Sequence, residues 1–270
     1  SVTPAINTRF DIYEKVTNGG VADSCPGTGS CPASINSVKD LVHKEDVPPI
    51  GVNKCAIKNN QWEAPSKPYL PTSGLASAEL AASNIPNAMG HPRDKCHSVT
   101  SGMPGYCAAK IGNGTWDRNA YFKVNYDWSS TEWDDNIATG DAAITWANPT
   151  RYEVYKWEIA NRDDLIDGAT ILASRAVGSN TDHDKPVCSS GQGYGSGIVP
   201  DDATVDRRRI SAAVINCDAY NVHGGGGTIY PVIKWIEMFL VEPSYNRDRT
   251  DANDVYVEII GETELGEGAT

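Results

Sequence analysis

The sequence predicts an α+β protein in which a few helices and long, disulfide-stapled loops surround an antiparallel sheet. Three runs in the last third of the chain have the composition of strands, and two runs in the middle third place apolar residues at helical spacing. The chain has 270 residues, of which 40% are apolar and 21% charged. This composition is typical of a globular protein and excludes collagen-like and disordered classes.

Three C-terminal strands form the centre of the predicted sheet. The first, 210–217, is small and apolar, and the second, 228–241, is long and rich in β-branched and aromatic residues. The third, 254–261, alternates its side chains with the period of a strand. Glycines 224–227 predict a mobile turn between the first two strands.

Helices are expected at three places. A short one is predicted at 77–83, and a second lies within 112–126 and begins at Asp117. The third spans 151–159, follows a Pro-Thr pair, and places Tyr152, Tyr155 and Ile159 on one face.

The first 110 residues are rich in Pro, Gly, Ser and Asn and have few periodic runs. We therefore expect one exported domain over 1–270, with a loop-rich half (1–110) packed on an α+β half (111–270). No stretch reaches the roughly 18 to 20 apolar residues of a transmembrane helix, and no leader precedes Ser1, so a processed or trimmed chain is expected.

Seven cysteines are the most informative count in the composition. They lie in loop-like contexts and lack zinc-site spacing, which favours disulfides in an exported protein over free thiols in a cytosolic one. The predicted pairs are Cys25–Cys31 and Cys96–Cys107, which close short loops, and Cys188–Cys217, which ties a loop to a strand, leaving Cys55 as the odd thiol.

The net charge of −12 argues against nucleic acid as a partner, because such proteins present a basic face. The one basic cluster, 207–209, directly follows three aspartates. No cofactor is predicted apart from Ca²⁺, for which oxygen-rich acidic loops are the usual ligands. The best calcium candidate is the group Asp248, Asp251, Asn253 and Asp254, with solvated loop residues as the alternative.

A further acidic segment, 127–131, is similar to the metal-adhesion signature of von Willebrand A domains. Thr131 replaces the second serine of that signature, and the preceding residues do not form an apolar strand, so a capped turn is the preferred interpretation.

No catalytic constellation is evident, and we do not expect an enzyme. The chain has five histidines and no Gly-x-Ser-x-Gly elbow, and Cys96 and His97 are adjacent, which is unsuited to a dyad on a strand. A secreted hydrolase remains an alternative.

The aromatic residues offer a second alternative, an adhesin or carbohydrate-binding module. Seven tryptophans and twelve tyrosines stand against three phenylalanines, and amphipathic rings are typical of sugar-binding platforms. Trp128 and Trp133 are the binding candidates, although a place in the core is the more common role for such rings.

Blocks in a fixed order carry a family resemblance. They are Asn-Thr-Arg-Phe-Asp-Ile-Tyr at 7–13, Gly-Asn-Gly-Thr-Trp-Asp-Arg at 112–118, 151–159, 206–217, Phe-Leu-Val-Glu-Pro at 239–243, and 255–261. Together they resemble the TadG-like proteins of the tight-adherence (Tad, Flp, type IVb) pilus system.

The resemblance implies a non-enzymatic, extracytoplasmic component of an adhesive pilus, either a minor pilin or an assembly or anchoring factor. Its partners would be other pilus subunits or assembly proteins, and its location the cell surface, pilus or periplasm. Family members contact the membrane through an N-terminal helix that is absent from this chain. The family offers no catalytic residues.

Charged residues within these blocks lie close to aromatic ones. We expect them to form buried or half-buried ion pairs that hold the N-terminal segment to the core. They are Arg9, Asp11, Asp117, Arg151 and Glu158.

Overall fold

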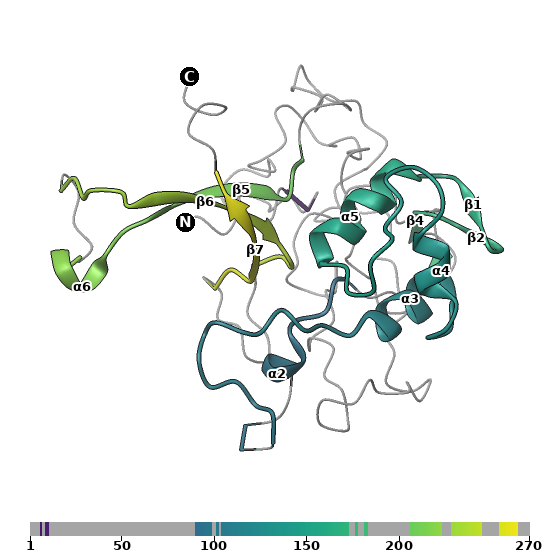
Figure 1. Ribbon diagram of the computed structural model, residues 1–270, viewed down its shortest axis with the longest axis horizontal. Helices are drawn as coiled ribbons and strands as arrows, with labels where there is room; N and C mark the ends of the chain where they lie inside the picture. Colours follow the sequence, from purple (N-terminus) through teal and green to yellow (C-terminus); the bar gives the residue numbers. More distant parts are fainter. Residues whose placement is uncertain are drawn as a thin grey trace, which may run out of the picture.

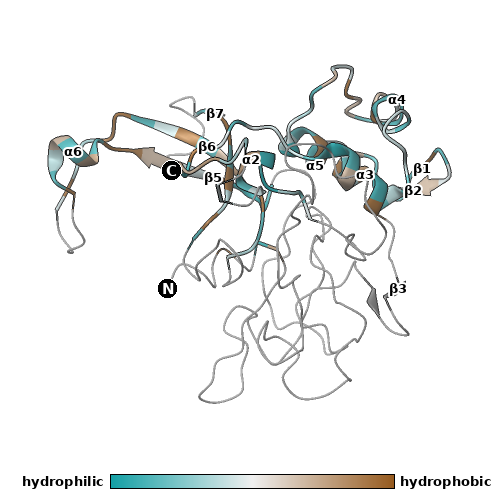
Figure 2. Ribbon diagram, turned by 90° about the horizontal axis from the view of Figure 1, so that it is seen from below, coloured by the Kyte–Doolittle hydropathy of each residue, from teal (hydrophilic) through white to brown (hydrophobic). Residues whose placement is uncertain are grey.

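The computed structural model describes residues 6, 9–10, 90–98, 101–102, 104–172, 176–177, 181–182, 206–222, 228–244 and 254–263. Figure 1 shows helices and a small hairpin at one end of this part and a long, projecting ribbon at the other. The view in Figure 2, turned by 90°, shows the same separation. The predicted α+β class is confirmed.

Two of the predicted helices are confirmed, and local sequence explains where each begins. Helix α3 spans Arg118–Tyr126, and the side chain of Asp117 accepts a hydrogen bond from the N–H of Ala120. Helix α5 spans Arg151–Ala160 and begins with a capping box between Thr150 and Glu153. Both caps satisfy backbone N–H groups that the first turn of a helix leaves unpaired.

Four-residue and five-residue helices were not predicted, because they are too short to show a period. They are α2 (Lys95–Ser98), α4 (Trp133–Ile137) and α6 (Cys217–Tyr220). The two-residue strands β1 (Leu165–Ile166) and β2 (Ala169–Thr170) pair as a hairpin, as do β3 (Ala176–Val177) and β4 (Thr181–Asp182).

The main sheet has the order β5-β6-β7 and is antiparallel throughout. Its strands are β5 (Arg209–Val214), β6 (Lys234–Leu240) and β7 (Val257–Glu262), which confirms all three predicted strands. Strand β6 is central and pairs Ala212 with Ile236 on one side and Leu240 with Val257 on the other. A register shift between Glu237 and Met238 interrupts the β6–β7 pairing.

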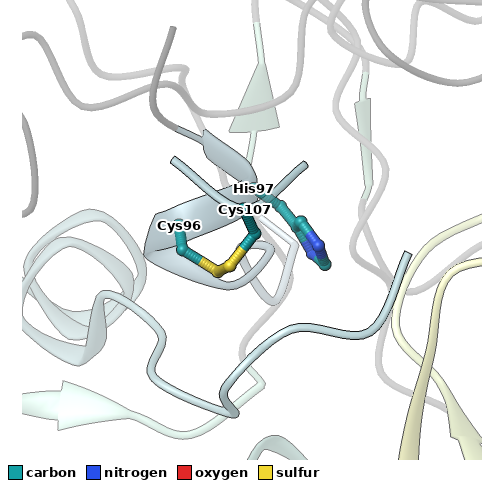
Figure 3. A group of neighbouring side chains, drawn as sticks. All are labelled: Cys96, His97 and Cys107. Carbon is teal, nitrogen blue, oxygen red and sulfur yellow. A yellow bond between two sulfur atoms is a disulfide. The ribbon is translucent and has the colours of Figure 1, made fainter. Parts of the chain in front are cut away.

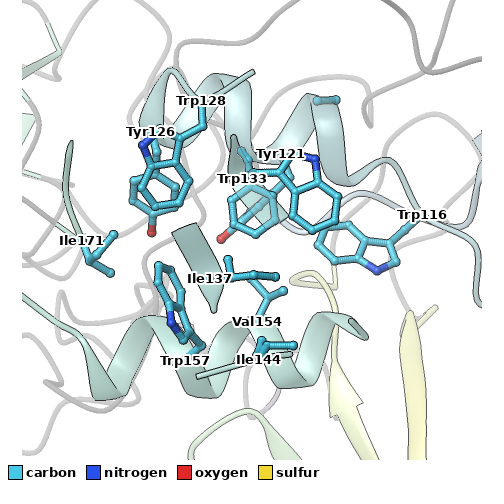
Figure 4. Close-up of a cluster of buried hydrophobic side chains, with 12 residues drawn as sticks. Trp116, Tyr121, Tyr126, Trp128, Trp133, Ile137, Ile144, Val154, Trp157 and Ile171 are labelled. Atoms are coloured by element: carbon cyan, nitrogen blue, oxygen red, sulfur yellow. The ribbon is translucent and has the colours of Figure 1, made fainter. Parts of the chain in front are cut away.

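Two hydrophobic clusters stabilise this arrangement. The larger one joins α3, α4 and α5 around aromatic rings, among them those of Trp133 and Trp157 (Figure 4). The rings of Phe122 and Trp133 stack with their centres 5.1 Å apart. The smaller one packs α5 on the sheet through Tyr152, Tyr155 and Phe239, with Ile159 partly buried beside them. The predicted apolar face of this helix is therefore confirmed.

Some predictions fall on residues outside those described. These are the helix at 77–83, the turn at 224–227, and most of the predicted loop-rich half, 1–110.

Candidate functional site

The predicted disulfide between Cys96 and Cys107 is present, and it links α2 to the loop that follows (Figure 3). His97 lies beside it, so three potential metal-ligating side chains fall within 4.8 Å of one another. Because both sulfur atoms are bonded to each other, neither is available as a thiolate ligand or nucleophile. This excludes the Cys96–His97 dyad as well as a thiolate metal site here.

The predicted Cys188–Cys217 disulfide is wrong, because Cys217 carries a free, exposed thiol in α6. The sequence placed this cysteine at the end of a strand, whereas the chain leaves β5 after Val214 and turns into a helix capped by Asn216. Cys25, Cys31, Cys55 and Cys188 lie outside the described residues.

Trp128 and Trp133 do not form a binding surface, so this prediction was wrong. They are 2% and 7% exposed and belong to the larger hydrophobic cluster, as Trp116 and Trp157 do. The ring of Trp133 also donates a hydrogen bond to Asn119 at 2.7 Å. A sugar cannot stack on these two rings, because both already pack on Phe122 and Trp128 also packs on Tyr126. Figure 4 shows Tyr126 and Trp128 beside each other.

The segment 127–131 is a capped turn, as preferred from the sequence. Asp127 ends α3 in the left-handed conformation and pairs with Lys123 one turn earlier. The hydroxyl groups of Ser129 and Thr131 bond to each other, and the N–H of Ser129 donates to Glu132. The turn is thus closed by hydrogen bonds among neighbouring residues.

The acidic loops give no assembled calcium site among the residues that the structure describes. Asp163 and Asp167 adopt positive φ angles at tight turns around the β1–β2 hairpin. Asp254 is exposed just before β7, and Asp248, Asp251 and Asn253 lie outside the described residues. Calcium binding there stays a prediction.

Arg151 is the centre of a buried charge network. Its guanidinium lies 2.6 Å from the carboxylate of Asp94 and 2.9 Å from that of Glu258, and it donates to the carbonyl of Pro92 at 2.7 Å. The side chain is only 1% exposed. Glu258 also accepts the backbone N–H groups at the start of α5, where the helix dipole favours a negative charge. The expected buried pairing of Arg151 is confirmed, with carboxylates that the sequence did not single out.

A second buried pair lies next to this network. Arg93 bonds to both carboxylate oxygens of Glu242, at 2.5 and 3.2 Å, and its guanidinium lies 5.3 Å from the ring centre of Tyr256. The hydroxyl of Tyr256 contacts His97 at 2.5 Å. Burial and the nearby charge of Asp94 raise the pKa of Tyr256 to about 12. Arg93 and Asp94 therefore bond to the residues that follow β6 and precede β7, namely Glu242 and Tyr256.

The turn at 112–114 completes the contacts of Asp94. The second carboxylate oxygen of Asp94 accepts a hydrogen bond from the N–H of Gly114 at 2.7 Å. A Cβ atom on Gly112 would lie 2.1 Å from that oxygen, so this close approach requires glycine. The Gly-Asn-Gly turn identified from the sequence thus has a structural role.

His91 and Glu158 form a third buried polar group, between α3, α5 and the sheet. One carboxylate oxygen of Glu158 accepts hydrogen bonds from Tyr121 at 2.5 Å and Tyr126 at 2.6 Å. The His91 ring stacks on Tyr121 with centroids 4.7 Å apart. In the described part of the chain, neither His91 ring nitrogen has a hydrogen-bond partner. Burial, and then the positive charges of Arg208 and Arg151, hold the pKa of His91 well below 6.5.

The described N-terminal residues lie against the segment that leads into β5. Arg9 donates to the carbonyl oxygens of Arg207 and Arg209, and the ring of Phe10 lies 4.6 Å from the guanidinium of buried Arg208. Asp117 caps α3, and Glu158 accepts tyrosine hydroxyls. Asp11 lies outside the described residues.

The most exposed apolar feature of the described chain is a projecting ribbon, which we call the arm. It comprises the described parts of residues 212–235: the end of β5, α6, and the segment leading into β6 (Figures 1 and 2). Ile229 is 95% and Ile233 64% exposed, and three more large side chains are substantially open. Those three are Tyr220, Val232 and Trp235. In the sequence from 212 to 233, Asp218 is the one charged side chain.

The groups described above are of two kinds: buried charge networks and the exposed arm. The charge networks connect α5, the sheet and residues 91–94, whereas the arm extends beyond them with its apolar side chains uncovered. The composition of 210–217 and 228–241 predicted two strands. Apolar composition alone does not show whether a strand is buried, so the sequence did not predict that one end of each segment lies outside the core. The arm is the candidate interaction site.

Within the described residues, no helix has the length and apolar character needed to cross a membrane. Comparisons with protein-family models, curated proteins and solved structures gave no match to this chain.

Proposed function

We propose that this chain is an extracytoplasmic, non-enzymatic component of a Tad/Flp-type adhesive pilus, and that its arm contacts other pilus subunits or assembly proteins. The order of the sequence blocks that resemble TadG-like proteins suggests the system. The arm is the structural observation that carries the proposal.

The arm has the properties of a protein contact surface. Large apolar patches exposed on a folded protein commonly mark interaction sites, because leaving them in water forfeits about 25 cal/mol for each Å² that a partner would cover. Ile229, Ile233 and Trp235 are exposed together on one projecting element. The scarcity of charge along it contrasts with the net charge of −12 of the whole chain.

The way in which the sheet at the foot of the arm is bound to the rest of the protein supports such a role. The sheet from which the arm extends is bound to α5 by an aromatic cluster and by Arg151, whose carboxylate partners come from 57 and 107 positions away in the sequence. A subunit in a filament must transmit force between neighbours, and buried, hydrogen-bonded networks give a fixed geometry for that purpose. The Cys96–Cys107 disulfide is consistent with an oxidising compartment.

The proposal is tested by shearing cells that express the native protein and probing filaments, envelopes and medium for this chain. We expect wild-type protein in the filament fraction if it is a subunit, or in the envelope fraction if it is an assembly factor. Ile229→Asp and Ile233→Asp on the arm should move the protein into the medium.

Ile111→Asp is the matched control, because Ile111 is 82% exposed and lies outside the arm. This variant should fractionate like the wild type. Wild-type protein found freely in the medium would overturn the pilus assignment, and arm variants that stay with filaments or envelopes would overturn the role of the arm.

A further inference from the structure

We infer that Arg208 and the chain around it form a docking site for a segment in which an arginine precedes an aromatic residue. Residues 9 and 10 of the same chain occupy this site, and the N-terminal segment of a second copy can enter it instead. This inference goes beyond the proposed pilus role and does not rest on it.

The guanidinium of Arg208 is the centre of the docking site. The side chain is buried, and its Nε and Nη2 donate to the carbonyl oxygens of Leu240 and Val241, each at 2.9 Å. The guanidinium also lies 4.5 Å from the ring centre of Phe239 and 5.2 Å from that of Tyr155. These contacts fix its position, so the surface that it presents to the N-terminal segment is preformed.

Phe10 packs on this guanidinium. Its ring centre lies 4.6 Å from the central carbon of Arg208, and the residue is 4% exposed. The face of an aromatic ring attracts a cation, and the attraction is stronger when both groups are removed from water. An aliphatic side chain of similar size would be buried in the same way but would lack this attraction. The site therefore favours an aromatic residue.

The residue before Phe10 adds a second point of recognition. Nη1 of Arg9 donates to the carbonyl oxygens of Arg207 at 2.8 Å and Arg209 at 3.3 Å. These carbonyl groups belong to the residues on either side of Arg208, whose guanidinium meets the Phe10 ring. A guanidinium carries five N–H donors in one plane, which suits it to bridge two backbone acceptors. An arginine followed by an aromatic residue thus fits both parts of the site.

Turns shape the backbone on both sides of the contact. In the N-terminal segment, the N–H of Arg9 donates to the carbonyl of Ile6 at 3.1 Å, and the Ile6 side chain is buried. On the other side, the Asp206 carboxylate accepts the N–H of Arg208 at 3.1 Å, and the Asp206 carbonyl accepts that of Arg209 at 3.2 Å. Both partners therefore meet as short, hydrogen-bonded turns.

The sequence indicates the N-terminal segment of a second copy as the other occupant. An arginine followed by an aromatic residue occurs in this chain only at 9–10 and 151–152, and the second pair already belongs to α5. Residues 11–89 separate Phe10 from the next described residue, so no adjoining described element dictates which copy the segment joins. A segment exchanged between copies makes the same contacts as within one chain, so exchange costs little contact energy.

A labelled peptide of residues 1–13, added to the full chain, tests the site. Phe10→Ala in the chain removes the ring that covers Arg208, whereas in the wild type the chain's own segment competes at high effective concentration. Fluorescence anisotropy should give a dissociation constant below about 1 mM for the Phe10→Ala chain and roughly tenfold weaker binding for the wild type. Ile111→Ala, an exposed position outside the site, should behave like the wild type.

Variants of the peptide test the chemistry of recognition. Phe10→Tyr in the peptide keeps an aromatic ring and should retain binding, whereas Phe10→Leu keeps an apolar side chain and should weaken binding about fivefold. Arg9→Ala in the chain is a second acceptor variant, which should bind the wild-type peptide more tightly than the wild-type chain does. Near-ultraviolet circular dichroism reports that each chain variant retains its fold.

Other outcomes overturn the inference. Equal binding of the peptide to the wild type and to both acceptor variants shows that it binds elsewhere, and no binding to either variant shows that the segment does not dock as a separate ligand. A Phe10→Leu peptide that binds as tightly as the Phe10→Tyr peptide excludes recognition of the ring by Arg208. None of these results alters the fractionation expected of a pilus component, so the two proposals fail independently.

Discussion

At the scale of single residues, buried charges organise the part of the protein that the structure describes. Arg151, Arg208 and Glu158 are each at most 1% exposed. A buried charge is costly unless it is paired and hydrogen-bonded, and removing one partner leaves the other uncompensated. We therefore expect the stability of this protein to respond more strongly to these few positions than to surface ion pairs.

Replacing Arg151 by alanine should lower the free energy of unfolding by roughly 3–5 kcal/mol, because Asp94 and Glu258 would remain buried without their partner. Urea denaturation followed by tryptophan fluorescence measures this loss. Lys123→Ala removes a solvent-exposed pair with Asp127 and should cost less than about 1 kcal/mol. Equal losses for the two variants would show that the Arg151 network does not stabilise the fold.

The buried His91 should make the protein less stable in mild acid. Its pKa is lowered in the folded state by burial and by Arg208 and Arg151, so below pH 6.5 the unfolded chain takes up a proton that the folded chain resists. Stability is therefore retained above the unfolded pKa and falls as the pH drops below it. Unfolding measured in urea at pH 7.5 and pH 5.5, values on either side of that pKa, should show the loss.

The control for this prediction is His91→Phe, which keeps the ring stacking on Tyr121 and removes the titrating group. At pH 7.5 this variant should be as stable as the wild type or more so, because two buried nitrogen atoms without hydrogen-bond partners are gone. It should also lose less stability between the two pH values. An unchanged pH dependence would mean that other groups cause it.

At the scale of elements, α5 is the helix that joins the sheet to the helical part. Its first turn carries a capping box, its N-terminal N–H groups bond to Glu258 from β7, and its apolar face packs on Phe239 of β6. The sequence pattern, the cap and the tertiary contacts therefore all place the start of α5 at Arg151.

Thr150→Ala should destabilise the protein by about 1 kcal/mol, because the side chain no longer accepts the N–H of Glu153. Thr150→Ser keeps the accepting hydroxyl and should lose less than half as much. Thermal unfolding monitored by circular dichroism compares the two variants with the wild type. A serine variant as unstable as the alanine variant would exclude the cap as the cause.

Elements with a long, regular pattern were predictable from the sequence, and short ones were not. Strands β5, β6 and β7 and helices α3 and α5 all followed from composition, spacing and capping residues. Helix α4 spans five residues and contains two aspartates between Trp133 and Ile137, so its single apolar turn shows no period. Its position is set by Trp133 packing on Phe122, a contact that only the tertiary structure provides.

At the scale of the whole molecule, the sequence identified which residues are unusual but rarely their partners. The spacing of Cys96 and Cys107 predicted a disulfide correctly, because a short loop limits the choice. Cys217 was assigned to a distant cysteine that spacing cannot select, and its thiol is free. Likewise, Arg151 was recognised as a buried charge, whereas Asp94 and Glu258 lie too far along the chain for a local pattern to connect them.

The Arg151 network has a consequence for the order in which the protein folds. One of its two carboxylates, Glu258, is made 107 residues after the arginine itself. Until β7 emerges from the ribosome, the first turn of α5 holds a cation that lacks this counter-charge. The helical part and the sheet should therefore consolidate together and late in synthesis, and such long-range closure predicts folding slower than that of a helical bundle of similar size.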